Sequence, residues 1–123
     1  MSGWVAVAGG GALGALLRYG VTVMTARGDA SGLPWHTLGV NVLGSFMLGL
    51  LMATLPAGVA GERWRLFAGV GVLGGFTTFS TFSVETVTLV QHGAVTTAAV
   101  HMLASLVGAV LGAAAGYAMG RAL

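Results

Sequence analysis

Long stretches without a charged residue constrain this chain more than any other feature of its sequence. No Asp, Glu, Lys or Arg occurs in residues 30–61, 66–84 or 86–120. Only 7% of the residues are charged, whereas soluble domains carry about 25%. A helix that crosses a bilayer needs about 20 mainly apolar residues, and four such segments fit. They are residues 4–26, 36–55, 66–91 and 94–120. The sequence therefore predicts an all-α integral membrane protein with four transmembrane helices.

Little of the chain remains outside these four segments, so we expect a single membrane domain over residues 1–123 and no separate soluble domain. The first segment could be mistaken for a signal peptide. It lacks a basic start, however, and its apolar character continues past Arg18, which favours an uncleaved first span. The chain has no cysteine, so disulfide and thiol chemistry are excluded.

Nucleic acid and nucleotide are not expected as partners. The net charge is only +2, and the five arginines are scattered rather than clustered into a basic surface. The segment GGGALG at residues 9–14 matches the dinucleotide-binding pattern G-x-G-x-x-G, and Asp29 follows downstream. That pattern requires a preceding strand and a surrounding βαβ unit. Here it lies inside an apolar helix, so we interpret its glycines as packing positions.

The distribution of arginine gives a weak signal for orientation. Four spans place both termini and the loop at residues 56–65 on one side, with three arginines, namely Arg63, Arg65 and Arg121. The other side has Arg27, and Arg18 lies inside the first span. Lys/Arg asymmetry near span ends sets orientation, and this asymmetry is small. Insertion in both directions, which would allow an antiparallel dimer, and insertion in one direction both stay open.

Four helices are too few to enclose a conduction path, so we expect function at a subunit interface. Most homo-oligomers are symmetric and two-fold dimers are commonest. The chain has 22 glycines, and small residues let membrane helices approach closely. We predict packing roles for the glycine stripes. They comprise Gly10 and Gly14, then Gly39, Gly44 and Gly49, and finally Gly108, Gly112 and Gly116.

Polar side chains inside the spans are candidates for function, because burial in hydrocarbon is costly unless they are paired or hydrated. Asn41 could donate to an anion or tie two helices together. Arg18 could reach the interface or give a vestibule positive potential. Glu85 could be an interfacial carboxylate or the partner of Arg18. His101 and Ser105 are four apart and share one face of the fourth span, without enough ligands for a metal site.

Two further histidines, His36 and His92, lie at span ends and are expected to face water.

The run GGFTTFSTFS at residues 74–83 predicts a break in the third span, at Gly74–Gly75. A broken membrane helix offers carbonyls that favour a cation and amides that favour an anion. Phenylalanines recur every third residue, and 79 and 82 stay near one another on a face; their ring edges carry positive potential. Five hydroxyl residues interleave with the rings, which argues against a purely lipid-facing helix. They are Thr77, Thr78, Ser80, Thr81 and Ser83.

Three segments together resemble the CrcB/Fluc family of fluoride channels. They are GGGALGALLRY at residues 9–19, GVNVLGSF at 39–46 and GGFTTFSTFSVE at 74–85, the last being the most specific. The resemblance implies an antiparallel, dual-topology homodimer with two fluoride pathways. It also implies a structural sodium ion at the dimer centre, held by the main-chain carbonyls of Gly74 and Thr77 from both subunits.

The same resemblance implies roles for individual side chains. Phe79 and Phe82 would be pore-facing rings, and Asn41 would donate to fluoride. Thr81 and Ser83 would supply hydroxyls near the path. Three further roles are implied: Arg18 near the aqueous entrance, Glu85 beyond the rings, and His101 with Ser105 as the start of a polar stripe. In the family this stripe often continues one turn later, whereas this chain has Ala109.

Passive export of fluoride across a bacterial inner membrane is therefore the expected function. Two alternatives stay open. A small dual-topology multidrug exporter would need a carboxylate inside the membrane to exchange protons for cationic drugs, and the first span has none. A non-transporting assembly subunit would carry no flux of its own. Enzymatic activity is not expected, because the sequence contains no nucleophile–base pair and no set of metal ligands.

Overall fold

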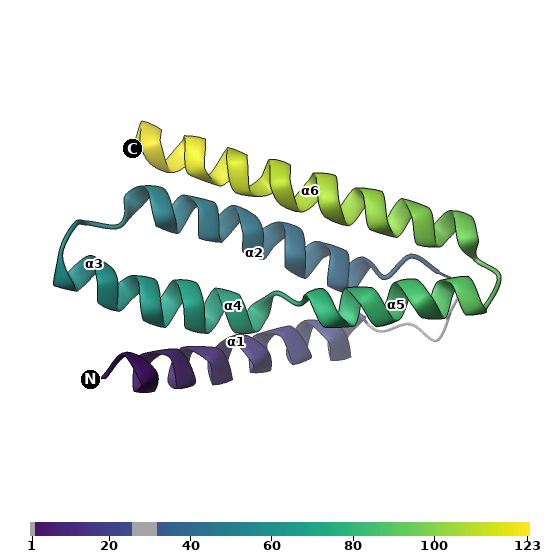
Figure 1. Ribbon diagram of the computed structural model, residues 1–123, viewed down its shortest axis with the longest axis horizontal. Coiled ribbons are helices and arrows are strands. Elements are labelled where there is room, and N and C mark those ends of the chain that lie inside the picture. Colours follow the sequence, from purple (N-terminus) through teal and green to yellow (C-terminus); the bar gives the residue numbers. More distant parts are fainter. Residues whose placement is uncertain (1, 26–31) are drawn as a thin grey trace.

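The chain folds into four long antiparallel helices in the computed structural model, which describes residues 2–25 and 32–123. Helices α1 and α2 are followed by a composite third span of four consecutive segments and by α6 (Figure 1). The bounds are α1 Gly3–Thr25, α2 Trp35–Thr54, α3 Val59–Trp64, π-helical η1 Arg65–Leu73, α4 Gly74–Phe76, α5 Phe79–Gln91 and α6 Val95–Ala122. Ala26, Arg27 and Asp29, which carried expectations above, lie outside the described residues.

The four spans run up and down, so both termini lie at the same end of the molecule, as expected (Figure 1). Each span is long and apolar enough to cross a membrane, and the prediction of an all-α membrane protein with four spans is confirmed. The third span begins at Val59 rather than near residue 66, because the chain turns into α3 directly after Gly58. Gly58 has a φ of 90°, a conformation that favours glycine.

The break in the third span is confirmed, but it lies later than predicted. Gly74 is helical, with φ −63° and ψ −39°. The helix ends at Thr77, whose ψ is 157°, and Thr78 is also extended, with φ −152° and ψ 123°. The prediction of a break at Gly74–Gly75 is therefore wrong by a few residues. Conformational freedom at glycine did not decide the position of the break.

Close approach of two backbones explains the glycines instead. A Cβ added to Gly75 would lie 2.6 Å from the carbonyl oxygen of Gly11, and a Cβ on Gly71 would lie 2.9 Å from Cα of Gly10. A Cβ on Gly14 would meet the carbonyl of Val72. Small residues let α1 contact η1 and α4 through main chain, which is the usual basis of close packing between membrane helices.

The second close contact joins α2 to α6. A Cβ on Gly116 would meet the carbonyl of Phe46, and a Cβ on Gly49 would meet the carbonyl of Ala113. Gly44 faces Thr77 and Phe76 in the third span. By contrast, Gly39 has nothing within 4 Å of an added Cβ, so its expected packing role is not realised within one protomer.

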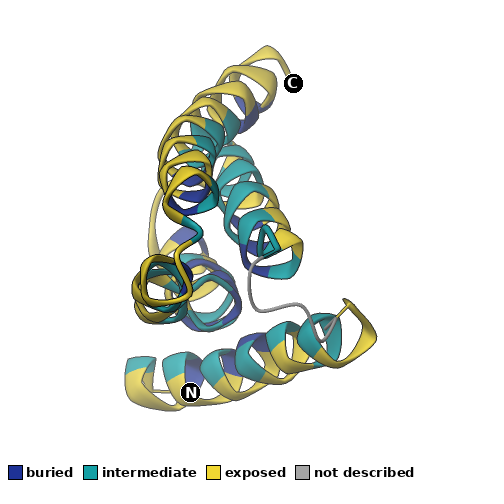
Figure 2. Ribbon diagram, turned by 90° about the vertical axis from the view of Figure 1, so that its right-hand side faces the viewer, coloured by how far each residue is buried: buried dark blue, intermediate teal, exposed yellow. Residues whose placement is uncertain are grey.

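Apolar side chains cover most of the outer surface. Buried residues lie on the sides of the helices that face one another, and exposed residues lie on the outer sides (Figure 2). Few large apolar side chains are buried, Leu73 and Leu89 among them. An outer surface of this kind suits lipid or another membrane-embedded chain rather than water.

Candidate functional site

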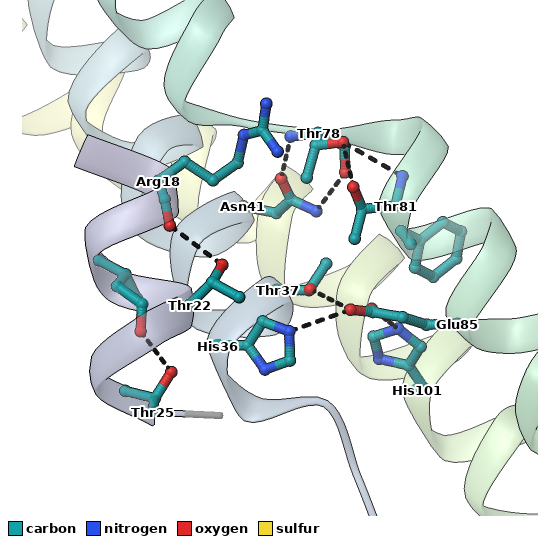
Figure 3. Close-up of polar contacts among 12 residues, drawn as sticks. Arg18, Thr22, Thr25, His36, Thr37, Asn41, Thr78, Thr81, Glu85 and His101 are labelled. Atoms are coloured by element: carbon teal, nitrogen blue, oxygen red, sulfur yellow. Dashed lines mark hydrogen bonds and ion pairs between the residues drawn. The ribbon is translucent and has the colours of Figure 1, made fainter. Parts of the chain in front are cut away.

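Asn41 connects α2 to the break in the third span. Its Nδ2 donates to the carbonyl oxygen of Thr78 at 2.9 Å, and its Oδ1 accepts from the Thr78 N–H at 2.7 Å (Figure 3). The carboxamide thus pairs with both backbone groups of one extended residue. Backbone groups inside a membrane must be satisfied within the protein, so Asn41 makes the break possible. The interpretation that Asn41 ties helices together is confirmed.

Main-chain carbonyls at the break lose their usual helical partners, as at any helix end, and those of Gly74 and Thr77 are among them. In an unbroken helix the N–H of Thr78 would donate to Gly74, and the N–H of Thr81 would donate to Thr77. Here the Thr78 N–H donates to Asn41 instead, and the Thr81 N–H donates to Oγ1 of Thr78 at 3.2 Å. The carbonyl oxygens of Gly74 and Thr77 are therefore released as acceptors. These are the two carbonyls to which the family resemblance assigns a sodium ion.

Arg18 caps the same helix end from α1. Its Nε donates to the carbonyl oxygen of Gly75 at 3.2 Å. The guanidinium is half-buried beside the break, and its other N–H groups donate to no acceptor among residues 2–25 and 32–123. The structure does not pair Arg18 with Glu85, which was one of the interpretations left open; the carboxylate contacts side chains of α2 and α6 instead.

Hydroxyl groups follow the break along the first turn of α5. Oγ1 of Thr78 donates to Oγ1 of Thr81 at 3.1 Å, which leaves the Thr81 hydroxyl hydrogen free to donate elsewhere. The Ser83 hydroxyl donates to the carbonyl of Phe79 at 2.9 Å. Of the two hydroxyls expected near the path, Thr81 therefore has a free donor, whereas the Ser83 donor is engaged by its own helix.

Three rings form a row beside these hydroxyls. Phe79 and Phe82 have ring centroids 5.5 Å apart, and Phe82 and His101 have centroids 5.0 Å apart. The prediction that 79 and 82 stay together on one face is confirmed. Phe79 is 79% exposed at the outer end of the row, whereas His101 is fully buried at the inner end. Phe76 lies apart, buried against Gly44.

A polar cluster of Glu85, His36, Thr37 and His101 lies at the inner end of the ring row (Figure 3). Oε1 of Glu85 accepts from the Thr37 hydroxyl at 2.6 Å and lies 3.1 Å from Nε2 of His36. Oε2 of Glu85 lies 3.3 Å from Nε2 of His101. The cluster joins one carboxylate of α5 to side chains of α2 and α6.

Sequence reasoning missed two members of this cluster. His36 was expected to face water, but its side chain is only 23% exposed and contacts Glu85. Its position at a span end suggested solvent, yet α2 begins at Trp35 and directs His36 inward. Thr37 was not considered. The available signal was its spacing, because Thr37 and Asn41 are four apart and share one face of α2. His92 is exposed, as expected.

His101 and Ser105 share one buried face of α6, as predicted, with exposures of 0% and 7%. Neither ring nitrogen of His101 nor the Ser105 hydroxyl has a hydrogen-bond partner among the described residues. Ala109 continues this face without a polar group. Within residues 2–25 and 32–123, no group of three His, Cys, Asp or Glu side chains is arranged to hold a metal ion.

Comparisons with known proteins converge on one family. A family model described as "CrcB-like protein, Camphor Resistance (CrcB)" matches residues 5–117. The chain is 48% identical to a Thermus thermophilus protein named "Fluoride-specific ion channel FluC", over 100% of this chain and 98% of that protein. An Agrobacterium fabrum protein of the same name is 47% identical, over 95% of this chain and 94% of that protein. The similarity thus covers α2 and the broken third span.

Proposed function

The chain belongs to the CrcB-like protein family, and from this premise we propose that it is a passive, fluoride-selective ion channel. It is an integral membrane protein with four spans, and relatives similar over nearly its whole length are named fluoride-specific ion channels. Export of fluoride down its gradient across a bacterial inner membrane would protect the cytoplasm. The observation that carries the proposal is the ring row Phe79–Phe82–His101 beside hydroxyl and amide donors inside a membrane span.

The proposed path replaces the water around fluoride with groups of this chain. Ring edges present positive potential, and a narrow pore selects by its width and by the donors that line it. Asn41 has a second amide hydrogen beyond the one that it donates to Thr78, and Thr81 has a free hydroxyl hydrogen. Both donors lie at the break beside the start of the ring row, so an anion there could exchange water for them stepwise.

An antiparallel homodimer with two paths is the assembly that we propose. Phe79 is 79% exposed in one protomer, at the outer end of the ring row. Gly74, with its released carbonyl, is exposed as well. A second copy packed against both groups would bury them, and a two-fold axis would give each copy the same environment. The weak arginine asymmetry is compatible with insertion in both directions.

A structural sodium ion at the centre of this dimer fits the donor chemistry of the break. Released main-chain carbonyls of Gly74 and Thr77 are hard oxygen donors without helical partners, the ligand type that hard cations prefer. Two copies would supply four such oxygens. The ion would add positive charge between two helix ends that both present carbonyls, and thereby hold the copies together.

Fluoride flux from liposomes tests the proposed function. The purified protein is reconstituted into vesicles loaded with fluoride, and efflux is followed with a fluoride electrode after a potassium ionophore sets the membrane potential. Chloride-loaded vesicles are measured in parallel. We expect fast, voltage-driven loss of fluoride with chloride retained. No flux of either ion from a confirmed dimer would favour a non-transporting assembly subunit. Proton-coupled uptake of a lipophilic cation would favour a multidrug exporter.

A further inference from the structure

Thr37 is the more buried of the two α2 residues that contact the Glu85 carboxylate. Its side chain is 2% exposed, and its hydroxyl donates to Oε1 at 2.6 Å. Nε2 of His36 lies 3.1 Å from the same oxygen (Figure 3). Both α2 side chains thus engage one carboxylate oxygen, and they leave Oε2 directed to the opposite side of the cluster.

His101 occupies that opposite side. Its Nε2 lies 3.3 Å from Oε2 of Glu85, and neither its ring nitrogens nor Oε2 has a hydrogen-bond partner among the described residues. The His101 ring lies directly beside Phe82, with centroids 5.0 Å apart. The position of the carboxylate therefore determines which polar group lies beside His101, the buried inner ring of the row.

We propose that Thr37 is a positioning residue, which acts through Glu85 to fix the orientation of His101 at the inner end of the ring row. A glutamate side chain has several rotatable bonds, and a hydrogen bond of 2.6 Å restricts their rotation. The Thr37 hydroxyl removes that freedom from one oxygen. The effect on flux rests on the proposed fluoride path, whereas the effect on His101 does not.

Fluoride efflux from a set of matched variants tests the contact of Thr37 with Glu85. Thr37→Val removes the hydroxyl and keeps the shape, and Thr37→Ser keeps the hydroxyl. We expect Thr37→Val to lower flux by roughly three- to tenfold, the order expected for the loss of one ordinary intramolecular hydrogen bond, and Thr37→Ser to restore most of it. Thr54→Val is the control, because the Thr54 hydroxyl bonds only to the α2 backbone at Leu50 and Leu51.

A double variant with Glu85 distinguishes a positioning role of Thr37 from a packing role. In a Glu85→Gln background, Thr37→Val should cause little additional loss of flux, because Thr37 would act through the carboxylate. Losses that multiply would show independent roles and overturn the proposal. Equal losses in Thr37→Val and Thr37→Ser would also overturn it, because they would point to side-chain volume rather than to the hydroxyl.

Imidazole ¹⁵N NMR of histidine-labelled protein in nanodiscs reports on the environment of His101 without a flux measurement. The His101 signals are assigned from a His101→Gln variant. We expect Thr37→Val and Glu85→Gln to shift them in the same direction, with Thr37→Ser and Thr54→Val near wild type. Unchanged His101 signals in Thr37→Val would overturn the proposal. Thr37→Ala gives the same comparison should the valine variant not fold.

The two readouts also distinguish the proposal from the function on which it rests. Wild-type protein without fluoride flux would overturn the proposed channel, and the NMR comparison would still judge Thr37. Wild-type flux with an unchanged His101 signal in Thr37→Val would leave the channel intact and remove Thr37 from it.

Discussion

At the scale of single residues, a few side chains form hydrogen bonds with backbone groups that lipid cannot satisfy. Asn41 pairs with the backbone of Thr78, and the Thr78 hydroxyl caps α5 through the Thr81 N–H. Sequence reasoning identified Asn41 as polar and buried, but its partner depends on where the third span breaks. It missed Thr37 and the inward direction of His36, because neither follows from composition near a span end. Both contacts depend on how α2 packs against α5.

Replacement of Asn41 should destabilise the protomer. Asn41→Leu leaves the N–H and the carbonyl of Thr78 without a partner, and each unsatisfied buried group costs about 1–3 kcal/mol. We expect a clearly lower melting temperature in detergent for this variant. Asn41→Asp keeps the acceptor for the Thr78 N–H and loses the donor, so it should fall between Asn41→Leu and wild type. A melting temperature equal to that of wild type in Asn41→Leu would show that the pairing is dispensable.

Replacement of Phe79 or Phe82, the rings proposed to line the path, should reduce fluoride flux and leave the proposed dimer intact. Phe82→Ile removes the ring between Phe79 and His101, and Phe79→Ile removes the outer end of the row. A lost ring contact of about 1 kcal/mol corresponds to a several-fold decrease in rate. Electrode-monitored efflux measures the effect, with Phe67→Ile as control, since Phe67 pairs with Trp64 away from the row. Undiminished flux in both ring variants would remove the rings from the mechanism.

At the scale of elements, the third span explains both the success and the limit of prediction. Its presence, its end at Gln91 and the existence of a break were predictable from hydrophobicity and from the run at residues 74–83, whereas its start at Val59 was not. The position of the break was not predictable either, because a glycine can serve either to break a helix or to let two helices approach closely. Gly75 is required where α4 approaches α1, so the helix continues through it. The break then occurs at Thr77 and Thr78, where Asn41 can accept and donate.

Close contact between α1 and the third span predicts a strong response to one added methyl group. A Cβ on Gly14 would lie 2.8 Å from the N of Phe76 and would also meet the Val72 carbonyl. Gly14→Ala should therefore cost about 1–3 kcal/mol, as overpacking usually does. Gly20→Ala is the matched control on the same helix, since nothing lies within 4 Å of its added Cβ. Equal melting temperatures of the two variants would contradict the packing described for α1.

At the scale of the whole molecule, one protomer is an open arrangement of four helices. The ring row ends at an exposed Phe79, and a released carbonyl lies at the exposed Gly74. These features are the basis for proposing a dimer and a central cation. Neither could be predicted from hydrophobic pattern alone, because the pattern does not distinguish a surface that meets lipid from one that meets a second copy.

Removal of sodium should weaken the dimer. In the proposed dimer, exchange of sodium for N-methyl-D-glucamine would leave the carbonyls of the two copies without a cation between them. We expect earlier dissociation on heating, measured by size-exclusion chromatography of detergent samples. Thr77→Ser should change little, because the proposed contact uses main chain. A dimer that is equally stable without sodium would contradict the assignment of the central ion.

Labelling of a single introduced cysteine tests dual insertion. The native sequence has no cysteine, so Leu123→Cys supplies one site at an exposed terminus. In intact spheroplasts, a membrane-impermeant maleimide should label one of the two copies in each antiparallel dimer, and the rest should react only after lysis. Complete labelling or complete protection before lysis would establish a single orientation.

The even number of crossings has a consequence for how such an assembly could be encoded by one gene. N and C termini of a protomer emerge at the same end (Figure 1). In an antiparallel pair, the C-terminus of one copy and the N-terminus of the other would then lie on opposite faces of the bilayer. A short linker could not join them, because it would have to traverse the hydrocarbon region. A tandem duplication would need an additional transmembrane helix between the halves. Each half would then have a fixed orientation, and the two halves could diverge in sequence.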